Sequence, residues 1–124
     1  MWVEGLIKNY TMELTRKCEE DFEKWYLKYI KSNSQKIISN TDVNYFNLLT
    51  KSMQYGVLVD YFDSVGIEIE IYKDYDLSDT PATFIGWIFF IEDYNGDKWF
   101  KTRAEARTAS IEKANELRNK VLNK

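Results

Sequence analysis

The spacing of apolar residues predicts a helix near the start of the chain, within residues 11–31. Apolar side chains there recur at intervals of three and four positions, which places them along one face of an α-helix. This stripe consists of Leu14, Cys18, Phe22, Trp25 and Tyr29. The Ser- and Asn-rich segment that follows, residues 32–44, is typical of a connecting loop.

A second helix is predicted over residues 50–66. Thr50 or Ser52 supplies its N-cap, and Gly66 stands where a left-handed residue ends a helix. Its apolar stripe consists of Leu58, Tyr61, Phe62 and Val65. Gly56 lies inside this helix and costs about 1 kcal/mol relative to alanine. We therefore expect another element to approach the helix closely at Gly56.

Strict alternation predicts a half-buried strand at residues 66–76, with isoleucines on one side and Glu68, Glu70 and Tyr72 on the other. Residues 84–102 predict a hairpin, because Asn95-Gly96 suits a two-residue type I′ turn. This register pairs Ile91 with Phe100. Both faces of the hairpin are apolar, so we expect both to be covered.

A final helix begins at the capping box formed by Thr102 and Glu105. The element order is then α-α-β-β-β-α. We expect an α+β fold in which a three-stranded antiparallel meander carries the last two helices on one face. The N-terminal helix, or a second subunit, would cover the other face. The length predicts a single domain over residues 1–124, with an N-terminal helix and connector (1–49) and an αβββα unit (50–124).

Residue types that are missing exclude several chemistries. The chain has one cysteine, Cys18, which rules out an intramolecular disulfide, and no histidine, which rules out His-based catalysis and His-ligated zinc or iron. We therefore expect neither a catalytic residue nor a metal or cofactor. No apolar run reaches the roughly 20 residues of a membrane span, and no signal peptide is recognisable. We expect a cytoplasmic protein of a host cell that does not contact the membrane.

Charge is unevenly distributed along the chain, and this leaves a nucleic-acid-binding alternative open. Residues 98–124 carry eight basic and three acidic side chains, a net of +5, so the total of −3 leaves −8 for residues 1–97. The last helix is similar to that of the double-stranded-RNA-binding domain, which also runs α-β-β-β-α and contacts phosphates there. The candidate phosphate contacts are Lys98, Lys101, Arg103 and Arg107. The alternative is a solvated basic face.

Two further groups of residues suggest other functions. Glu68, Glu70 and Glu92 lie on predicted strands and resemble the acid clusters of magnesium-dependent phosphoesterases. Acids on an edge strand also serve to block edge-to-edge pairing. The second group is the aromatic set Tyr72, Phe84, Phe90 and Trp99. This set could be buried under the N-terminal helix, bind a protein or a second copy of the chain, or stack on single-stranded bases.

A family resemblance favours the protein-binding interpretation. The stretches SMQYGVLVDYFDSVGIEI (residues 52–69) and FKTRAEARTASIEKANEL (residues 100–117) resemble short uncharacterised proteins encoded by phages and prophages of anaerobic gut bacteria. The resemblance implies a small accessory protein and supplies no catalytic residue. We therefore expect a non-catalytic phage-type protein that binds a host or phage protein, such as a host-defence factor, and inhibits it. The chain could also form a homodimer. Nucleic-acid binding and a magnesium-dependent phosphoesterase are the alternatives.

Overall fold

The structure is a computed structural model that describes residues 12–33, 46–92, 94–95 and 98–124. The helices are α1 (Arg16–Asn33), α3 (Lys51–Ser64) and α4 (Arg103–Leu122). The strands are β1 (Ile69–Asp76), β2 (Thr83–Ile91) and β3 (Tyr94–Asn95). The α+β class predicted from the sequence is therefore confirmed.

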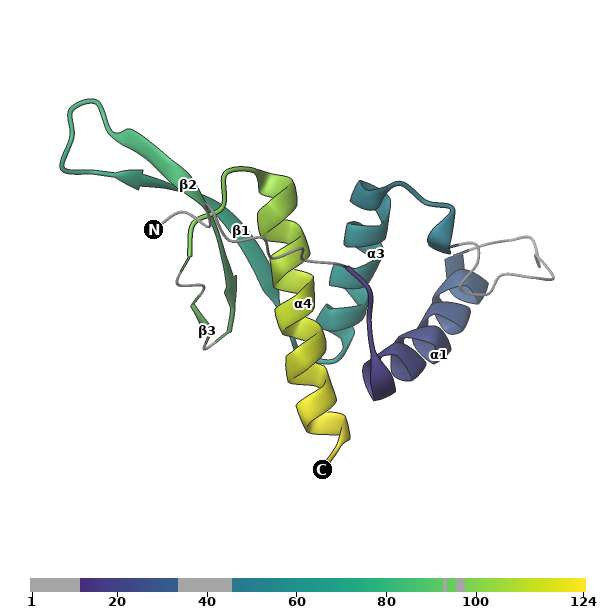
Figure 1. Ribbon diagram of the computed structural model, residues 1–124. Coiled ribbons are helices and arrows are strands. Elements are labelled where there is room, and N and C mark those ends of the chain that lie inside the picture. The colour runs from purple at the N-terminus through teal and green to yellow at the C-terminus, as the bar shows by residue number, and fades with distance from the viewer. Residues whose placement is uncertain (1–11, 34–45, 93, 96–97) are drawn as a thin grey trace.

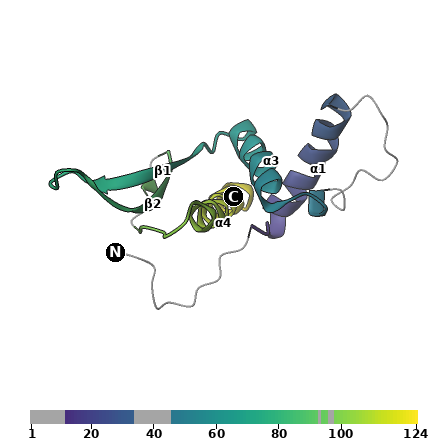
Figure 2. The same ribbon diagram turned by 90° about the horizontal axis from the view of Figure 1, so that it is seen from above.

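Helix α4 lies at the centre of the fold. Figures 1 and 2 show it between the sheet on one side and the helices α3 and α1 on the other. Many of its buried residues are small or polar, so neighbouring elements approach its backbone on several sides. These residues are Ala106, Ala109, Ser110, Ile111, Ala114, Asn115 and Asn119.

Helix α1 packs against α4 and α3. The predicted stripe is confirmed at Cys18 and Phe22, which are buried, while Trp25 is half-buried. The stripe missed Tyr26, which is buried and stacks on Phe22 with ring centroids 5.5 Å apart. Both views place α1 on the far side of α3 and α4 from the sheet (Figures 1 and 2). The expectation that α1 covers the second face of the sheet is wrong.

Two asparagines of α4 hold the start of α1. The Cys18 N–H donates to Asn119 Oδ1 at 2.9 Å, and the Thr15 N–H donates to Asn115 Oδ1 at 3.0 Å. The two amide groups donate in return, Asn115 to Thr15 Oγ1 at 3.0 Å and Asn119 to the Thr15 carbonyl at 3.1 Å. The first turn of a helix has unpaired N–H groups. Here side chains from the other end of the sequence supply a partner for the Cys18 N–H in that turn and for the Thr15 N–H just before it.

The predicted ends of α3 are confirmed. Thr50 Oγ1 accepts a hydrogen bond from the Met53 N–H at 3.2 Å, and Gly66 has φ 82°, the left-handed conformation that ends many helices. Gly56 is exposed, and a Cβ atom built there would meet no atom within 4 Å. The expected close approach at Gly56 is wrong.

Strands β1 and β2 form a long antiparallel hairpin with the expected alternation. Ile69 is opposite Ile91, and Ile71 is opposite Phe89, so the apolar side chains of both strands meet on one face. The register shifts between Asp74 and Tyr75, where β2 carries one extra residue. Such a bulge turns the side chains beyond it to the other face of the sheet.

The predicted three-stranded meander is wrong. Among the described residues the sheet is essentially the two-stranded β1–β2 hairpin, because β3 is only two residues long. The chain turns back directly after β2, so that Ile91 is opposite Tyr94, and Glu92 takes φ 41°. Asn95 pairs with Phe90 and so lies in β3, not at the predicted turn. A separate bridge joins Trp87 to Phe100, which is buried as expected but in a different register.

Gly56, inside α3, and Gly66, just after its end, give a matched test of what a Cβ atom costs at each position. We expect Gly56→Ala to raise the free energy of unfolding by about 0.5–1 kcal/mol, because it improves an exposed helix interior without a clash. Gly66→Ala should lower it by about 1–2 kcal/mol, because a Cβ disfavours the left-handed region. Chemical denaturation of the two variants measures both effects. A loss of stability in Gly56→Ala would contradict the open surface at that position.

Candidate functional site

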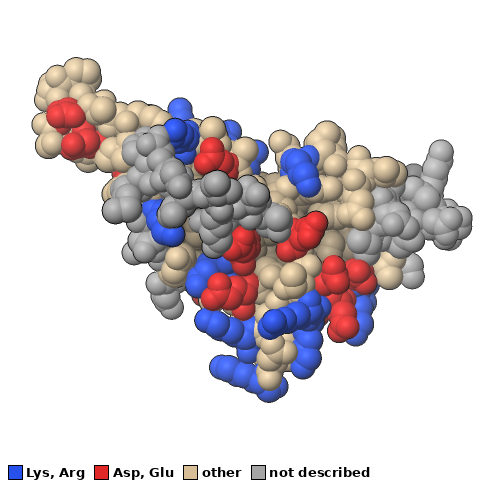
Figure 3. Space-filling model, in the orientation of Figure 1, with Lys and Arg blue, Asp and Glu red and all other residues tan. Residues whose placement is uncertain are grey.

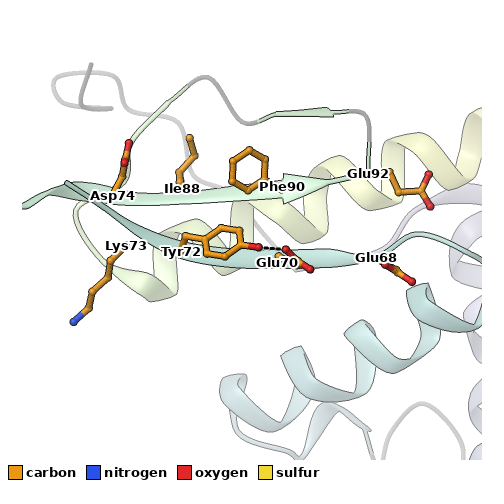
Figure 4. Close-up of a pocket in the computed structure, with 8 residues that line it drawn as sticks. All are labelled: Glu68, Glu70, Tyr72, Lys73, Asp74, Ile88, Phe90 and Glu92. Carbon is orange, nitrogen blue, oxygen red and sulfur yellow. Dashed lines mark hydrogen bonds between the residues drawn. The ribbon is translucent and has the colours of Figure 1, made fainter. Parts of the chain in front are cut away.

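The two faces of the β1–β2 sheet differ in what covers them. The inner face packs against α4 and contributes Phe89 and Ile91 to the core. The outer face points away from α4 (Figure 4). We use "outer face" for Glu68, Glu70, Tyr72, Asp74, Ile88, Phe90, Glu92 and Trp99. A groove of about 600 Å³ runs along it. Lys73 also lines this groove, although its Nζ lies 5.4 Å from the centre of the Trp87 ring.

Aromatic rings and carboxylates contact each other directly on the outer face. Tyr72 and Phe90 meet edge to face, with ring centroids 5.3 Å apart. The Tyr72 hydroxyl donates a hydrogen bond to the Glu70 carboxylate, which raises the pKa of the tyrosine (Figure 4). Trp99 Nε1 donates to Asp74 Oδ2 at 2.6 Å. These contacts fix the rings in place while leaving part of each exposed.

Three of the four predicted aromatic residues come together on this face, and Phe84 does not. Tyr72, Phe90 and Trp99 lie on it. The ring centroid of Phe84 lies 5.8 Å from that of Tyr75 and 6.4 Å from that of Trp87. Trp87 belongs to the inner face, where Arg103 of α4 stacks on it. The bulge in β2 turns Phe84 to that side. Gly86 lies directly beside the extra residue of β2, and an isolated glycine inside a strand is a sequence signal for a bulge that the alternation alone overlooks.

The predicted acids line the groove without converging. Glu68, Glu70 and Glu92 all border it. Within the described part of the chain, however, no three His, Cys, Asp or Glu side chains are placed to hold a metal ion together. The structure therefore gives the phosphoesterase hypothesis no metal-binding geometry to rest on.

The two arginines predicted to bind phosphate stack on aromatic rings of neighbouring elements. The Arg103 guanidinium lies 4.7 Å from the centre of the Trp87 ring, and that of Arg107 lies 5.0 Å from the centre of the Tyr55 ring. These contacts join α4 to β2 and to α3. Lys98 and Lys101 are exposed.

Sequence reasoning missed a cluster of titratable groups between α1, α3 and α4. Tyr61, which is fully buried, donates to Asp21 Oδ2 at 2.6 Å, and Arg118 Nη2 donates to the same oxygen at 2.9 Å. Burial raises the pKa of Asp21, but these hydrogen bonds outweigh it and lower the pKa overall. Burial and the bond to Asp21 raise the pKa of Tyr61 well above its usual range. No sequence motif links three residues so far apart in the chain.

Cys18 lies beside this cluster, and its thiol is unreactive. Burial raises the pKa of its thiol to about 11, and the side chain has no exposed surface. A thiol is a nucleophile only as the thiolate. Cys18 therefore fills space in the core, and the cluster around it joins helices.

Charge is unevenly spread over the face of the molecule in Figure 3. Figure 3 shows acidic side chains at the tip of the β1–β2 hairpin and basic side chains around the C-terminal end of α4. At that basic end Lys17 Nζ donates to the Leu122 carbonyl at 3.2 Å, which adds a cation from α1. Over the described residues, no helix combines the length and the apolar character that crossing a membrane requires.

Comparisons with protein-family models, with curated proteins and with solved structures give no match. The outer face, whose rings and carboxylates belong to two neighbouring strands and to Trp99, is therefore the candidate functional surface.

The helix cluster predicts how stability depends on pH. The folded pKa of Asp21 is lowered, so its contribution is present above its unfolded pKa, about 3.9, and is lost as the pH falls through the folded pKa. Because the carboxyl is about one-third exposed, we expect Asp21→Asn to cost only about 1 kcal/mol at pH 7. The difference in the free energy of unfolding between Asp21→Asn and the wild type should become smaller below about pH 4.

The matched control is Glu20→Gln, which removes an exposed carboxyl on the same helix. It should leave the free energy of unfolding within about 0.5 kcal/mol of the wild type. Denaturant titrations of the three proteins between pH 7 and pH 3 measure both effects. A gap for Asp21→Asn that is independent of pH would contradict the role given to the carboxylate.

Proposed function

We propose that this chain is a protein-binding module and that the outer face is its binding surface. The observation that carries this proposal is the aromatic row of an exposed Tyr72 and a half-buried Phe90 and Trp99. Helix α1 does not cover this row, because it packs on α4 and α3. Tyr72 keeps 43% of its surface exposed although it is held by Phe90 and Glu70. Rigid, partly exposed aromatic side chains are typical anchors of protein interfaces.

The chemistry of the outer face favours a protein over a nucleic acid. Base stacking on Tyr72 and Phe90 would bring phosphates close to Glu70, Asp74 and Glu92. Phosphates and carboxylates repel each other. Proteins that bind single strands place basic grooves beside their stacking rings instead. A protein partner meets no such repulsion, because basic side chains complement the carboxylates.

The double-stranded-RNA alternative is less well supported. It requires Arg103 and Arg107 to reach phosphates, and each guanidinium instead lies on a ring of a neighbouring element. Releasing them would cost the cation–π contact, about 0.5–2 kcal/mol each. It also relied on a three-stranded meander, which the fold does not have.

The biological setting we propose comes from the resemblance of residues 52–69 and 100–117 to small phage and prophage proteins. In that setting the module acts without catalysis on a host or phage protein, such as a host-defence factor. The outer face supports this role by offering a preformed surface that needs no reacting group.

The test is affinity purification of the tagged chain from host lysate, with and without nuclease, using two matched variants. Tyr72→Ala removes the exposed ring of the outer face. Tyr75→Ala removes a ring with nearly the same exposure, 41%, from the opposite face of the same strand. We expect a stoichiometric partner that survives nuclease, binds Tyr75→Ala as well as the wild type, and binds Tyr72→Ala about tenfold or more weakly.

Other results would contradict the proposal in distinct ways. Equal binding of both tyrosine variants would mean that the outer face is not the interface. Partners that vanish with nuclease, and whose binding falls with salt and in an Arg103→Ala/Arg107→Ala variant, would establish the nucleic-acid alternative instead.

A further inference from the structure

Strand β1 is an edge of the sheet. The strand order is β1-β2-β3, so among the described residues β1 pairs with β2 on one side only. The strand is eight residues long, which is enough to template another strand. A free edge of this length is normally covered or blocked, since its unpaired backbone groups attract other chains.

The hydrogen bonds of the neighbouring strand show which backbone groups are free. The Trp87 N–H donates to the Phe100 carbonyl at 2.8 Å, and the Phe100 N–H donates back at 2.8 Å, so both polar groups of Trp87 point away from β1. Successive residues of an antiparallel strand point to opposite sides. Ile88 therefore points toward β1, where it is opposite Tyr72, and Trp87 is opposite Lys73.

It follows that alternate residues of β1 have different roles. The N–H and C=O groups of Tyr72 face β2 and hold the hairpin together. Those of Ile71 and Lys73 face the free edge. The side chains alternate in step with this: Glu70, Tyr72 and Asp74 lie on the outer face, and Ile71 packs toward the core.

We propose that the free edge of β1 pairs with an extended segment of the partner protein that carries basic residues at alternate positions. This inference rests on the proposed function and names the mode of binding. The backbone of the segment would bond to Ile71 and Lys73. Its basic side chains would lie beside Glu70 and Asp74, and its apolar side chains beside Ile71.

The charges on β1 select this partner over a second copy of the chain. Two β1 strands side by side would bring their rows of outer-face carboxylates together, and like charges in neighbouring strands destabilise pairing. A basic segment removes this repulsion and replaces it with opposite-charge pairs. The acids that protect the edge against self-association thus leave it open to a basic strand.

The experiment uses the whole chain and a defined probe, an eight-residue peptide of alternating valine and arginine that matches the length of β1. Amide hydrogen exchange is followed by NMR. In the free chain we expect the Ile71 and Lys73 amides to exchange faster than that of Tyr72. Peptide at ten times its Kd should slow exchange at Ile71 and Lys73 about tenfold and leave Tyr72 unchanged.

Two controls separate pairing from simple charge attraction. A peptide of alternating valine and aspartate should not slow exchange. Lys73→Pro removes a backbone N–H that faces the free edge and spares the bonds to β2, so it should bind the arginine peptide about tenfold more weakly than Lys73→Ala, which keeps the N–H. The exchange data on the wild type decide the matter even where Lys73→Pro unfolds.

Failure of this inference is distinguishable from failure of the proposed function. No binding of the arginine peptide, or binding that leaves Ile71 and Lys73 unprotected, overturns strand pairing. Strand pairing is also overturned if the captured partner binds a folded Lys73→Pro variant but not Tyr72→Ala. That result leaves the outer face as the interface. Tyr72→Ala binding as tightly as the wild type overturns the proposed function itself.

Discussion

The hydrogen bonds from Asn115 and Asn119 of α4 to the start of α1 are the constraint on which the rest of the structure depends. They give the Thr15 and Cys18 N–H groups partners that the local sequence does not supply, and so hold the N-terminal end of α1 against α4. Buried polar groups of this kind are costly unless paired, so they specify one arrangement of the helices. Because α1 is held there, it does not reach the sheet, and the outer face keeps its exposed rings.

Helix α4 can serve two sides at once because its buried residues are small or polar. Alanines at 106, 109 and 114 let neighbouring elements approach its backbone, and the larger aromatic residues come from its neighbours. The arginines at the start of α4 extend this role by stacking on Trp87 and Tyr55. Basic residues that suggest phosphate binding in the sequence thus join α4 to the sheet and to α3. The outer face, which we propose as the binding surface, is acidic and aromatic.

The residues of the candidate surface could be predicted in part. Tyr72 and Phe90 follow from simple alternation along strands, and the structure brings them to one face. The Asn95-Gly96 register that puts Trp99 beside them is wrong, but Phe100 pairs with Trp87 in place of Ile91, an even number of residues away, so Trp99 keeps the same face. Strict alternation misplaces Phe84, because a bulge beside Gly86 reverses the side on which it lies. The glycine signals that a bulge is possible there, but not which side chains it turns. The Asp21–Tyr61–Arg118 cluster could not be predicted either, since its members come from three helices and meet only after packing.

The sequence by itself determined the helices, the β1–β2 alternation, both ends of α3 and the start of α4 at Thr102, because caps, glycines and periodicity act over a few residues. Only the tertiary structure decided the turn after β2, the position of α1 and the role of the arginines. Asn95-Gly96 is a strong local turn signal, yet the chain turns at Glu92, and the core buries Phe100 opposite Trp87. Phe100 is buried in the predicted register as well, so what the observed register adds is its stacking on Phe89 beside Trp87. Packing of this kind can outweigh a local preference of about 1 kcal/mol.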